Sequence, residues 1–419
     1  MSRTRFQLLT LLVAVLMAGP SVFAQEELRQ RTGDANAKPA EQADAEQEEA
    51  EEEKAVPKEY TFDVKVNLEH TDVKSQDQTG TCWCFASASF IESEMIRQGK
   101  GKHQLSEMFI VNNIYFEKAN NYLLRKGKAQ FSEGALAHDF LNAAGRYGMV
   151  PDEVYSGLID GDQTHNHAEM AAVLQGMLDG LVKQRTLSDN WQSAYRAVVD
   201  TYLGSAPEQF SYQGKDYTPK SFAEQMGFNA DDYVSYTSYT HHPFDRPFVL
   251  EIPDNFSNGL FHNVEIDRLV AMIDQALENG FTVAWDGDVS ERGFSQNNGV
   301  AVLPKNPNRR DALRNPGPEM DVTQEMRQDT FESYSTTDDH LMHLVGMAHD
   351  QHGTKYYIIK NSWGASGQHD GYLYMSEAYV RLKTVAIILH KDAMSGSGET
   401  ANTEVADEAA ASEQEDGTR

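Results

Sequence analysis

Residues 76–97, QDQTGTCWCFASASFIESEMIR, determine how the rest of the chain can be interpreted. A polar loop leads into a segment in which Phe85, Phe90 and Ile91 recur at helical spacing, which predicts a buried helix. Cys82 falls in the first turn of that helix. Unpaired N–H groups and the positive end of the helix dipole meet there, and both favour a thiolate. Cys82 is therefore a candidate nucleophile; the alternative is a small buried apolar residue, which most free cysteines are.

A second informative stretch lies near the C-terminus. Residues 338–364, DDHLMHLVGMAHDQHGTKYYIIKNSWG, predict a β-hairpin with its turn near residues 351–354. His340 lies on the first arm and Asn361 on the second. A thiol that attacks a carbonyl needs a base, and the base needs a hydrogen-bond acceptor that orients it. Cys82, His340 and Asn361 can supply these three roles.

These residues resemble the motifs of the papain superfamily of cysteine peptidases. In that superfamily a glutamine ahead of the nucleophile helps to form the oxyanion hole, and Gln76 stands six residues before Cys82. The sequence NSWG at residues 361–364 is similar to the family pattern whose tryptophan shields the His–Asn hydrogen bond. By this resemblance Gln76 stabilises the oxyanion and Trp363 covers the site.

Further short matches extend the resemblance between these motifs. The sequence LSE at residues 105–107 resembles a family segment, and Gly134 falls in a segment that resembles the one lining the substrate backbone. The resemblance therefore implies that Gly134, together with Trp83 and Trp363, contributes to substrate binding.

Two histidines compete for the role of the base. His340 and His343 are three residues apart, so on a strand they face opposite sides. The superfamily has a glycine six residues after its catalytic histidine, and Gly346 holds that place relative to His340. We therefore predict that His340 is the base and that His343 is packed or lies on the outer face of the strand.

The 14 histidines of the chain also raise the question of a metal site. The HxxH at residues 340–343 is not the HExxH of a metalloprotease helix, and no carboxylate or thiol spacing completes a closed zinc site there or at His241 and His242. We predict that activity requires no metal and no cofactor.

The middle of the chain narrows the resemblance to one branch. TPKSF, YTSYTHHPF and WDGDV, between residues 218 and 289, resemble segments of the bleomycin hydrolase/aminopeptidase C branch. The resemblance implies an α+β, papain-like fold, with a helical lobe and a twisted antiparallel β lobe. Residues 152–280 would form a large, mostly helical insertion, predicted from apolar residues at helical spacing. The branch also implies a homohexameric ring.

Both ends of the chain differ from its body. Residues 1–24 have the basic start, apolar centre and A-x-A-like end of a signal peptide, so we expect export to a periplasmic or extracellular location. Residues 25–57 carry 11 acidic and 4 basic residues and predict a disordered spacer. A peptidase domain would then span residues 58–393, and residues 394–419 would form a flexible acidic tail.

Charge and cysteine content exclude several classes of function. The net charge is −28, which argues against nucleic-acid binding because that binding depends on neutralising phosphates. No second long apolar run follows the signal, so we expect no stable membrane anchor. The only cysteines are Cys82 and Cys84, too few for a disulfide framework, and we expect Cys84 to be packed behind the nucleophile.

The predicted activity is cysteine-type hydrolysis of peptide bonds, with removal of N-terminal residues favoured. In the resembled branch the C-terminal arm blocks one side of the cleft and its carboxylate holds the substrate's amine. The C-terminal residues of this chain are long enough to reach a cleft, although their composition offers little apolar surface to order them. The alternatives are an endopeptidase of the same mechanism and a catalytically inactive peptide-binding scaffold.

Overall fold

The computed structural model describes residues 59–159 and 161–395. The predicted signal peptide and spacer, and all but the first two residues of the predicted tail, lie outside the described residues. Within the described part, no helix is both long and apolar enough to cross a membrane.

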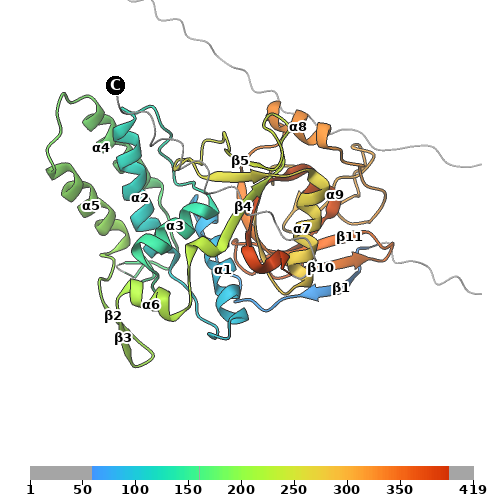
Figure 1. Cartoon of the computed structure of the whole chain (residues 1–419), viewed down its shortest axis with the longest axis horizontal. Coiled ribbons are helices and arrows are strands. Elements are labelled where there is room, and N and C mark those ends of the chain that lie inside the picture. The colour runs from blue at the N-terminus through green and yellow to red at the C-terminus, as the bar shows by residue number, and fades with distance from the viewer. Residues whose placement is uncertain (1–58, 160, 396–419) are drawn as a thin grey trace, which may run out of the picture. The chain divides into compact units, whose positions relative to one another are not determined.

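A helical lobe surrounds the helix that begins at the predicted nucleophile (Figure 1). Its helices are α1 (Cys82–Arg97), α2 (Glu107–Leu124), α3 (Ala137–Tyr147), α4 (Ala168–Val182), α5 (Asn190–Leu203) and α6 (Pro219–Gln225), with a small hairpin of β2 (Phe210–Tyr212) and β3 (Lys215–Tyr217). Helix α1 packs against α2 and α3 on one side and against strands β7 and β10 on the other. It is therefore buried almost all round, which explains its apolar composition.

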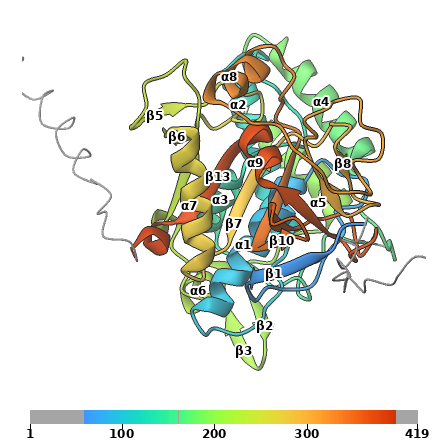
Figure 2. The ribbon, with the colours of Figure 1, turned by 90° about the vertical axis from the view of Figure 1, so that its right-hand side faces the viewer.

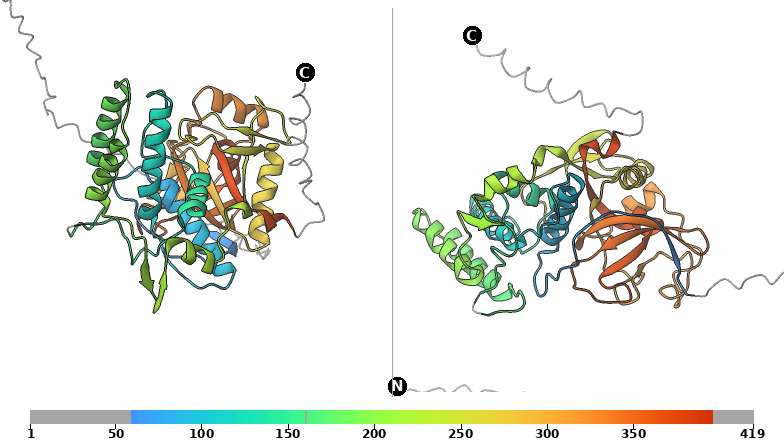
Figure 3. Two further views of the ribbon diagram at one scale, coloured as in Figure 1. Left: turned by 60° about the vertical axis from the view of Figure 1, so that its left-hand side comes forward. Right: turned by 90° about the horizontal axis from the view of Figure 1, so that it is seen from below.

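The second lobe is built on one large sheet (Figures 1 and 3). Its strands run in the order β5 (Arg246–Val249), β6 (Leu260–Asn263), β4 (Tyr233–Thr237), β13 (Thr384–His390), β7 (Val283–Gly287), β10 (His340–Asp350), β11 (Lys355–Lys360), β12 (Tyr372–Ser376), β9 (Val300–Ala301) and β8 (Phe294–Ser295), and β1 (Phe62–Asn67) also pairs with β10. Most neighbouring strands are antiparallel.

The two faces of this sheet have different partners. Helices α7 (Ile266–Glu278) and α9 (Glu377–Lys383) lie beside the sheet (Figure 2). They share an apolar cluster with Val283, Trp285 and Met342. Ala284 and Leu341, which alternate with those residues along β7 and β10, belong to the cluster that contains α1. A further helix, α8 (Gln324–Glu332), and two short 3-10 helices, η1 (Ala230–Asp232) and η2 (Lys391–Met394), complete the described elements. The central strands thus separate α1 from α7.

Several predicted elements are present at the expected places. The predicted hairpin is β10 and β11, with Asn361 directly after β11. The last helix of the predicted insertion is α7, and strand β7 begins five residues after it ends. Between them, Phe281 stacks on the ring of His390.

The described chain ends far from the nucleophile. The guanidinium of Arg97, the last residue of α1, lies over the ring of Phe281, which in turn stacks on His390 at the end of β13. Cys82 is the first residue of the same 16-residue helix. At 1.5 Å per residue the two ends of α1 are roughly 24 Å apart. The C-terminal tail therefore leaves the described structure at the end of α1 opposite to the nucleophile.

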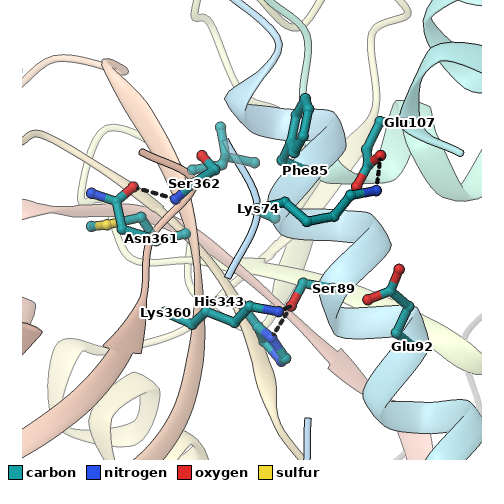
Figure 4. A pocket seen from close by; sticks show the side chains of 12 residues that line it. Lys74, Phe85, Ser89, Glu92, Glu107, His343, Lys360, Asn361 and Ser362 are labelled. Carbon is teal, nitrogen blue, oxygen red and sulfur yellow. Dashed lines mark hydrogen bonds and ion pairs between the residues drawn. The ribbon is translucent and has the colours of Figure 1, made fainter. Parts of the chain in front are cut away.

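A buried ionic network joins the two lobes beside the site (Figure 4). Lys74 Nζ lies 2.6 Å from Glu107 Oε2 and 3.1 Å from Asp152 Oδ1. Lys360, from β11, donates to Ser89 Oγ of α1 at 2.8 Å. Burial raises the pKa of Glu107 to about 7 even though Lys74 opposes the shift. The network holds α1 against the sheet. It therefore helps to keep the cleft residues of α1 and of the sheet in position relative to one another.

Lys74→Met is expected to lower the free energy of unfolding by about 3–5 kcal/mol, because it leaves the buried Glu107 without its cation. Urea denaturation at pH 8 measures this. The matched control is Lys305→Met, which breaks an exposed pair with Asp321 and should leave stability unchanged within error. Equal effects of the two substitutions would show that the buried pair does not hold the lobes.

Candidate active site

A cleft of about 550 Å³ lies between the lobes and contains most of the predicted site residues. Cys82, at the start of α1, and His340, at the start of β10, both line it. Gln76, Gly134 and Trp363 line the same cleft. The structure therefore brings together residues that are up to 287 positions apart in the sequence.

The predicted base is held by the predicted orienting residue. His340 Nε2 lies 2.7 Å from Asn361 Oδ1, which also accepts from the backbone N–H of Ser362 at 2.7 Å. Asn361 Nδ2 donates to Gln296 Oε1 at 2.8 Å, so the orientation of the amide is fixed. His340 Nε2 consequently carries the proton in the neutral ring, and Nδ1 is left as the acceptor for a thiol proton.

Trp363 covers this pair from the solvent side. Its ring centroid lies 4.7 Å from that of His340, and the side chain is 38% exposed. A partly exposed indole over the imidazole limits the access of water to the bond between His340 and Asn361. Phe294 meets the indole edge-on, with the ring centroids 6.0 Å apart, and supports its position.

The amide of Gln76 is oriented by two hydrogen bonds. Its Oε1 accepts from Ser362 Oγ at 2.7 Å and its Nε2 donates to the carbonyl oxygen of Thr79 at 2.7 Å. An amide nitrogen has two N–H donors, so one remains for an anion in the cleft. The backbone N–H of Cys82, at the first position of α1, has no partner within the helix. These two donors can form an oxyanion hole.

The environment of Cys82 differs from the prediction in one respect. The cysteine does begin the helix, but burial raises the pKa of its thiol to about 12, and the carboxyls of Asp338 and Asp286 add to this shift. Burial likewise lowers the pKa of His340 to about 4, against the opposing effect of Asn361. The effect of burial on the thiol pKa outweighs the effect of the helix dipole at the start of α1. Burial thus opposes the thiolate that the helix start favours.

The predicted substrate contact of Trp83 is not supported. The side chain is 1% exposed and lies outside the cleft lining, and its indole N–H donates to the carbonyl oxygen of Glu133 at 3.0 Å. It therefore supports the wall next to Gly134 from behind. Cys84 is buried, as predicted, and its Sγ donates to the carbonyl oxygen of Glu107.

His343 is fully packed. Its Nδ1 lies 2.8 Å from Ser89 Oγ, and Ser89 Oγ is already the acceptor for Lys360 Nζ. The serine hydroxyl keeps its own proton, which it can donate to Nδ1 of His343. Burial, followed by the charge of Lys360, holds the pKa of His343 well below its usual value. His343 stays neutral, with Nδ1 occupied, which leaves His340 as the base.

Four carboxyl groups in the cleft were not predicted from the sequence: Glu133, Asp254, Asp338 and Asp339. Asp254 comes from the predicted insertion and accepts from Gln130 Nε2 at 2.7 Å. A Cβ atom placed on Gly134 would lie 2.0 Å from Asp254 Oδ2, so this carboxylate rests directly on the glycine. The DDH sequence that ends at His340 was the only local signal of this acidity.

One group of side chains in the described residues has the composition of a metal site: His241, His242 and Glu251. The Nε2 atoms of the two histidines lie 3.2 Å and 2.7 Å from the carboxylate oxygens. Gln328 Oε1 accepts from the N–H of Thr240, so Gln328 Nε2 donates to Nδ1 of His241. That bond leaves the proton of neutral His241 on Nε2, facing Glu251, where a metal would need a lone pair. The cluster is arranged as a hydrogen-bonded set.

The two lobes and the cleft between them define a cysteine peptidase of papain-like fold. The chain belongs to the Peptidase C1-like family, whose family model matches residues 23–409.

Relatives and a solved structure agree with this assignment. Aminopeptidase G of Lactobacillus delbrueckii subsp. lactis is 24% identical over 380 residues, covering 77% of this chain and 82% of the relative. Aminopeptidase C of Lactococcus lactis subsp. cremoris is 24% identical over 374 residues, covering 79% and 83%. The crystal structure of PepW from Lactobacillus rhamnosis superposes with a TM-score of 0.63 at 20% identity, covering 79% and 82%. The predicted resemblance to the aminopeptidase C branch is confirmed.

Proposed function

We propose that the protein is an aminopeptidase that uses Cys82, His340 and Asn361 to hydrolyse the first peptide bond of its substrate. The main support for this chemistry is that Cys82 and His340 line the same cleft. Asn361 is hydrogen-bonded to Nε2 of His340. The preference for N-terminal residues is supported by relatives named aminopeptidases and by the acidic lining of the cleft, which suits a substrate with a positive amine.

The reaction follows from the positions of these groups. Cys82 Sγ attacks the carbonyl carbon while its proton passes to Nδ1 of His340, so no free thiolate need form beforehand. Gln76 Nε2–H and the Cys82 N–H stabilise the oxyanion, each such donor being worth ~3 kcal/mol of barrier. The imidazolium then protonates the leaving amine, and a thioester remains on Cys82. Water, deprotonated by His340, hydrolyses the thioester and restores the thiol.

An endopeptidase of the same mechanism would differ only in not requiring a free N-terminal amine on the substrate. The wild-type enzyme is expected to cleave an alanyl anilide at least about tenfold faster, in kcat/KM, than its N-acetylated twin, because the acidic cleft stabilises the ammonium and acetylation removes that charge. Equal rates on the two substrates would identify an endopeptidase. Absence of both cleavage and labelling by a thiol-directed epoxide would identify an inactive scaffold instead.

A further inference from the structure

Asp286 is a buried carboxyl beside the cleft, and no cation of the described residues is paired with it. Asp286 lies on β7 directly opposite Leu341 of β10, the residue that follows His340. Asp286 is 4% exposed, and among the described residues no N–H or O–H group donates to its carboxylate oxygens in ordinary hydrogen-bond geometry. Buried polar groups are nearly always paired, because an unpaired one costs free energy that folding must offset. A carboxyl in this state, with only other carboxyls as its strongest charged neighbours, can accept a cationic partner from outside the chain.

The charged neighbours of Asp286 are themselves acidic. The charged groups that act on it most strongly are three further carboxyls: Asp338, Asp254 and Asp339. Asp338 lies close enough for the two carboxyl groups to share a proton. Burial, together with this like-charge neighbour, raises the pKa of Asp286 well above its usual value, and burial raises that of Asp338 to about 7. The pair therefore holds a proton when the site is empty.

The pair lies at the cleft and at a small cavity beside it. Asp338 lines the cleft together with Cys82 and Gly134. Asp286 lines a small cavity with Leu136 and Leu341, and Leu341 also lines the cleft. The cavity walls are otherwise mostly apolar, and its space suits one group of about the size of a water molecule. A small cation in this cavity would have Asp286 on one side and apolar walls on the other, with Asp338 on the side of the cleft.

We propose that Asp286 and Asp338 form an anionic subsite that binds a primary ammonium group of the peptide substrate. An ammonium group has three N–H donors and the size of a water molecule, so it can donate to both carboxyls and replace their shared proton. The proposal rests on the proposed peptidase function and adds its specificity element. Two sources can supply the ammonium. One is the free N-terminus of the substrate, and the other is the side chain of a lysine that precedes the residue whose carbonyl is attacked.

This subsite offers an alternative to an anchor in the C-terminal tail. The tail leaves the described structure at the far end of α1, whereas Asp338 lies two residues from His340 and Asp286 acts directly on the pKa of Cys82. If Asp286 and Asp338 bind the amine, the C-terminal tail is not needed to bind it. A chain truncated after Met394 should therefore keep its preference for free amines.

The test compares kcat/KM for four substrates in five enzymes. The substrates are an alanyl anilide, its N-acetylated twin, and acetylated dipeptide anilides with lysine or norleucine as the first residue. The enzymes are the wild type, Asp286→Asn, Asp338→Asn, the chain truncated after Met394 and the control Asp321→Asn, which makes the same exchange at a residue on the surface. We expect Asp286→Asn to lower kcat/KM for the ammonium-bearing substrate by roughly 100-fold and to leave its uncharged twin within about twofold. The control and the truncated chain should match the wild type.

Each outcome has a defined meaning. Loss of the preference for the free amine assigns the subsite to the N-terminus, and loss of a preference for lysine over norleucine assigns it to a side chain. An active wild type whose preference survives both Asp286→Asn and Asp338→Asn overturns the subsite and leaves the peptidase function standing. An equal fall on charged and uncharged substrates also overturns it. A wild type that cleaves none of the four overturns the proposed function itself. Asp338→Asn serves as the test variant if Asp286→Asn does not fold.

Discussion

Cys82→Ala is expected to lower kcat by at least about three orders of magnitude without unfolding the protein, because it removes the atom that forms the covalent intermediate. The side chain lies at the edge of the cleft and not in the centre of the core, so alanine leaves the start of α1 in place. The loss is measured as steady-state turnover of a free-amine anilide, alongside a thermal melt.

Cys84→Ala is the matched control for that substitution. Its sulfur is buried against Glu107, on the opposite side of the helix from the cleft, so it should keep most of its activity and lose a modest amount of stability. A thiol-directed epoxide should label the wild type and Cys84→Ala but not Cys82→Ala. If Cys84→Ala is the inactive variant, the nucleophile has been misassigned.

His340→Ala is expected to lower kcat/KM by about 10²–10⁴-fold, because it removes the imidazole that takes the thiol proton and that Asn361 holds by its other nitrogen. The acid limb of the wild-type kcat/KM profile should reflect the same residue. His340 acts in its neutral form, and burial lowers its pKa to about 4, so activity should persist below pH 6 and fall as the pH approaches 4.

His343→Ala separates a catalytic from a structural histidine. Its ring is buried between Ser89 and Phe90, so removal should reduce stability while the acid limb of the profile stays in place. Titration of kcat/KM between pH 3.5 and 8 for both variants decides the matter. If the acid limb of the kcat/KM profile shifts in His343→Ala and stays unchanged in His340→Ala, then His343 is the catalytic base.

Much of the fold could be predicted because its signals are local. Helix α1 and the hairpin of β10 and β11 each arise from one continuous apolar pattern, and the loop and turn residues at their ends mark the boundaries. The contribution of the predicted insertion to the sheet was not anticipated. Its strands β4, β5 and β6 are each four or five residues long, too short for periodicity to distinguish from loops.

The same distinction separates the site residues that were predicted from those that were not. Cys82, His340 and Asn361 stand within short motifs, so their neighbours in the sequence reveal them. Asp286 meets Asp338 only because β7 pairs with β10 in one register, and no local pattern encodes that register. The thiol pKa was mispredicted for a related reason: a helix start is visible in the sequence, whereas burial depends on the whole fold.

The glycine at the wall of the cleft also restricts how this chain can evolve. No side chain, not even a methyl group, fits at Gly134 while Asp254 keeps its position, because the two would overlap. The reverse does not hold, since a smaller residue in place of Asp254 would leave Gly134 undisturbed. A larger residue at position 134, which would narrow the cleft, can therefore be accepted only after Asp254 has been replaced. The inserted segment thus determines the order in which substitutions that change substrate preference can occur.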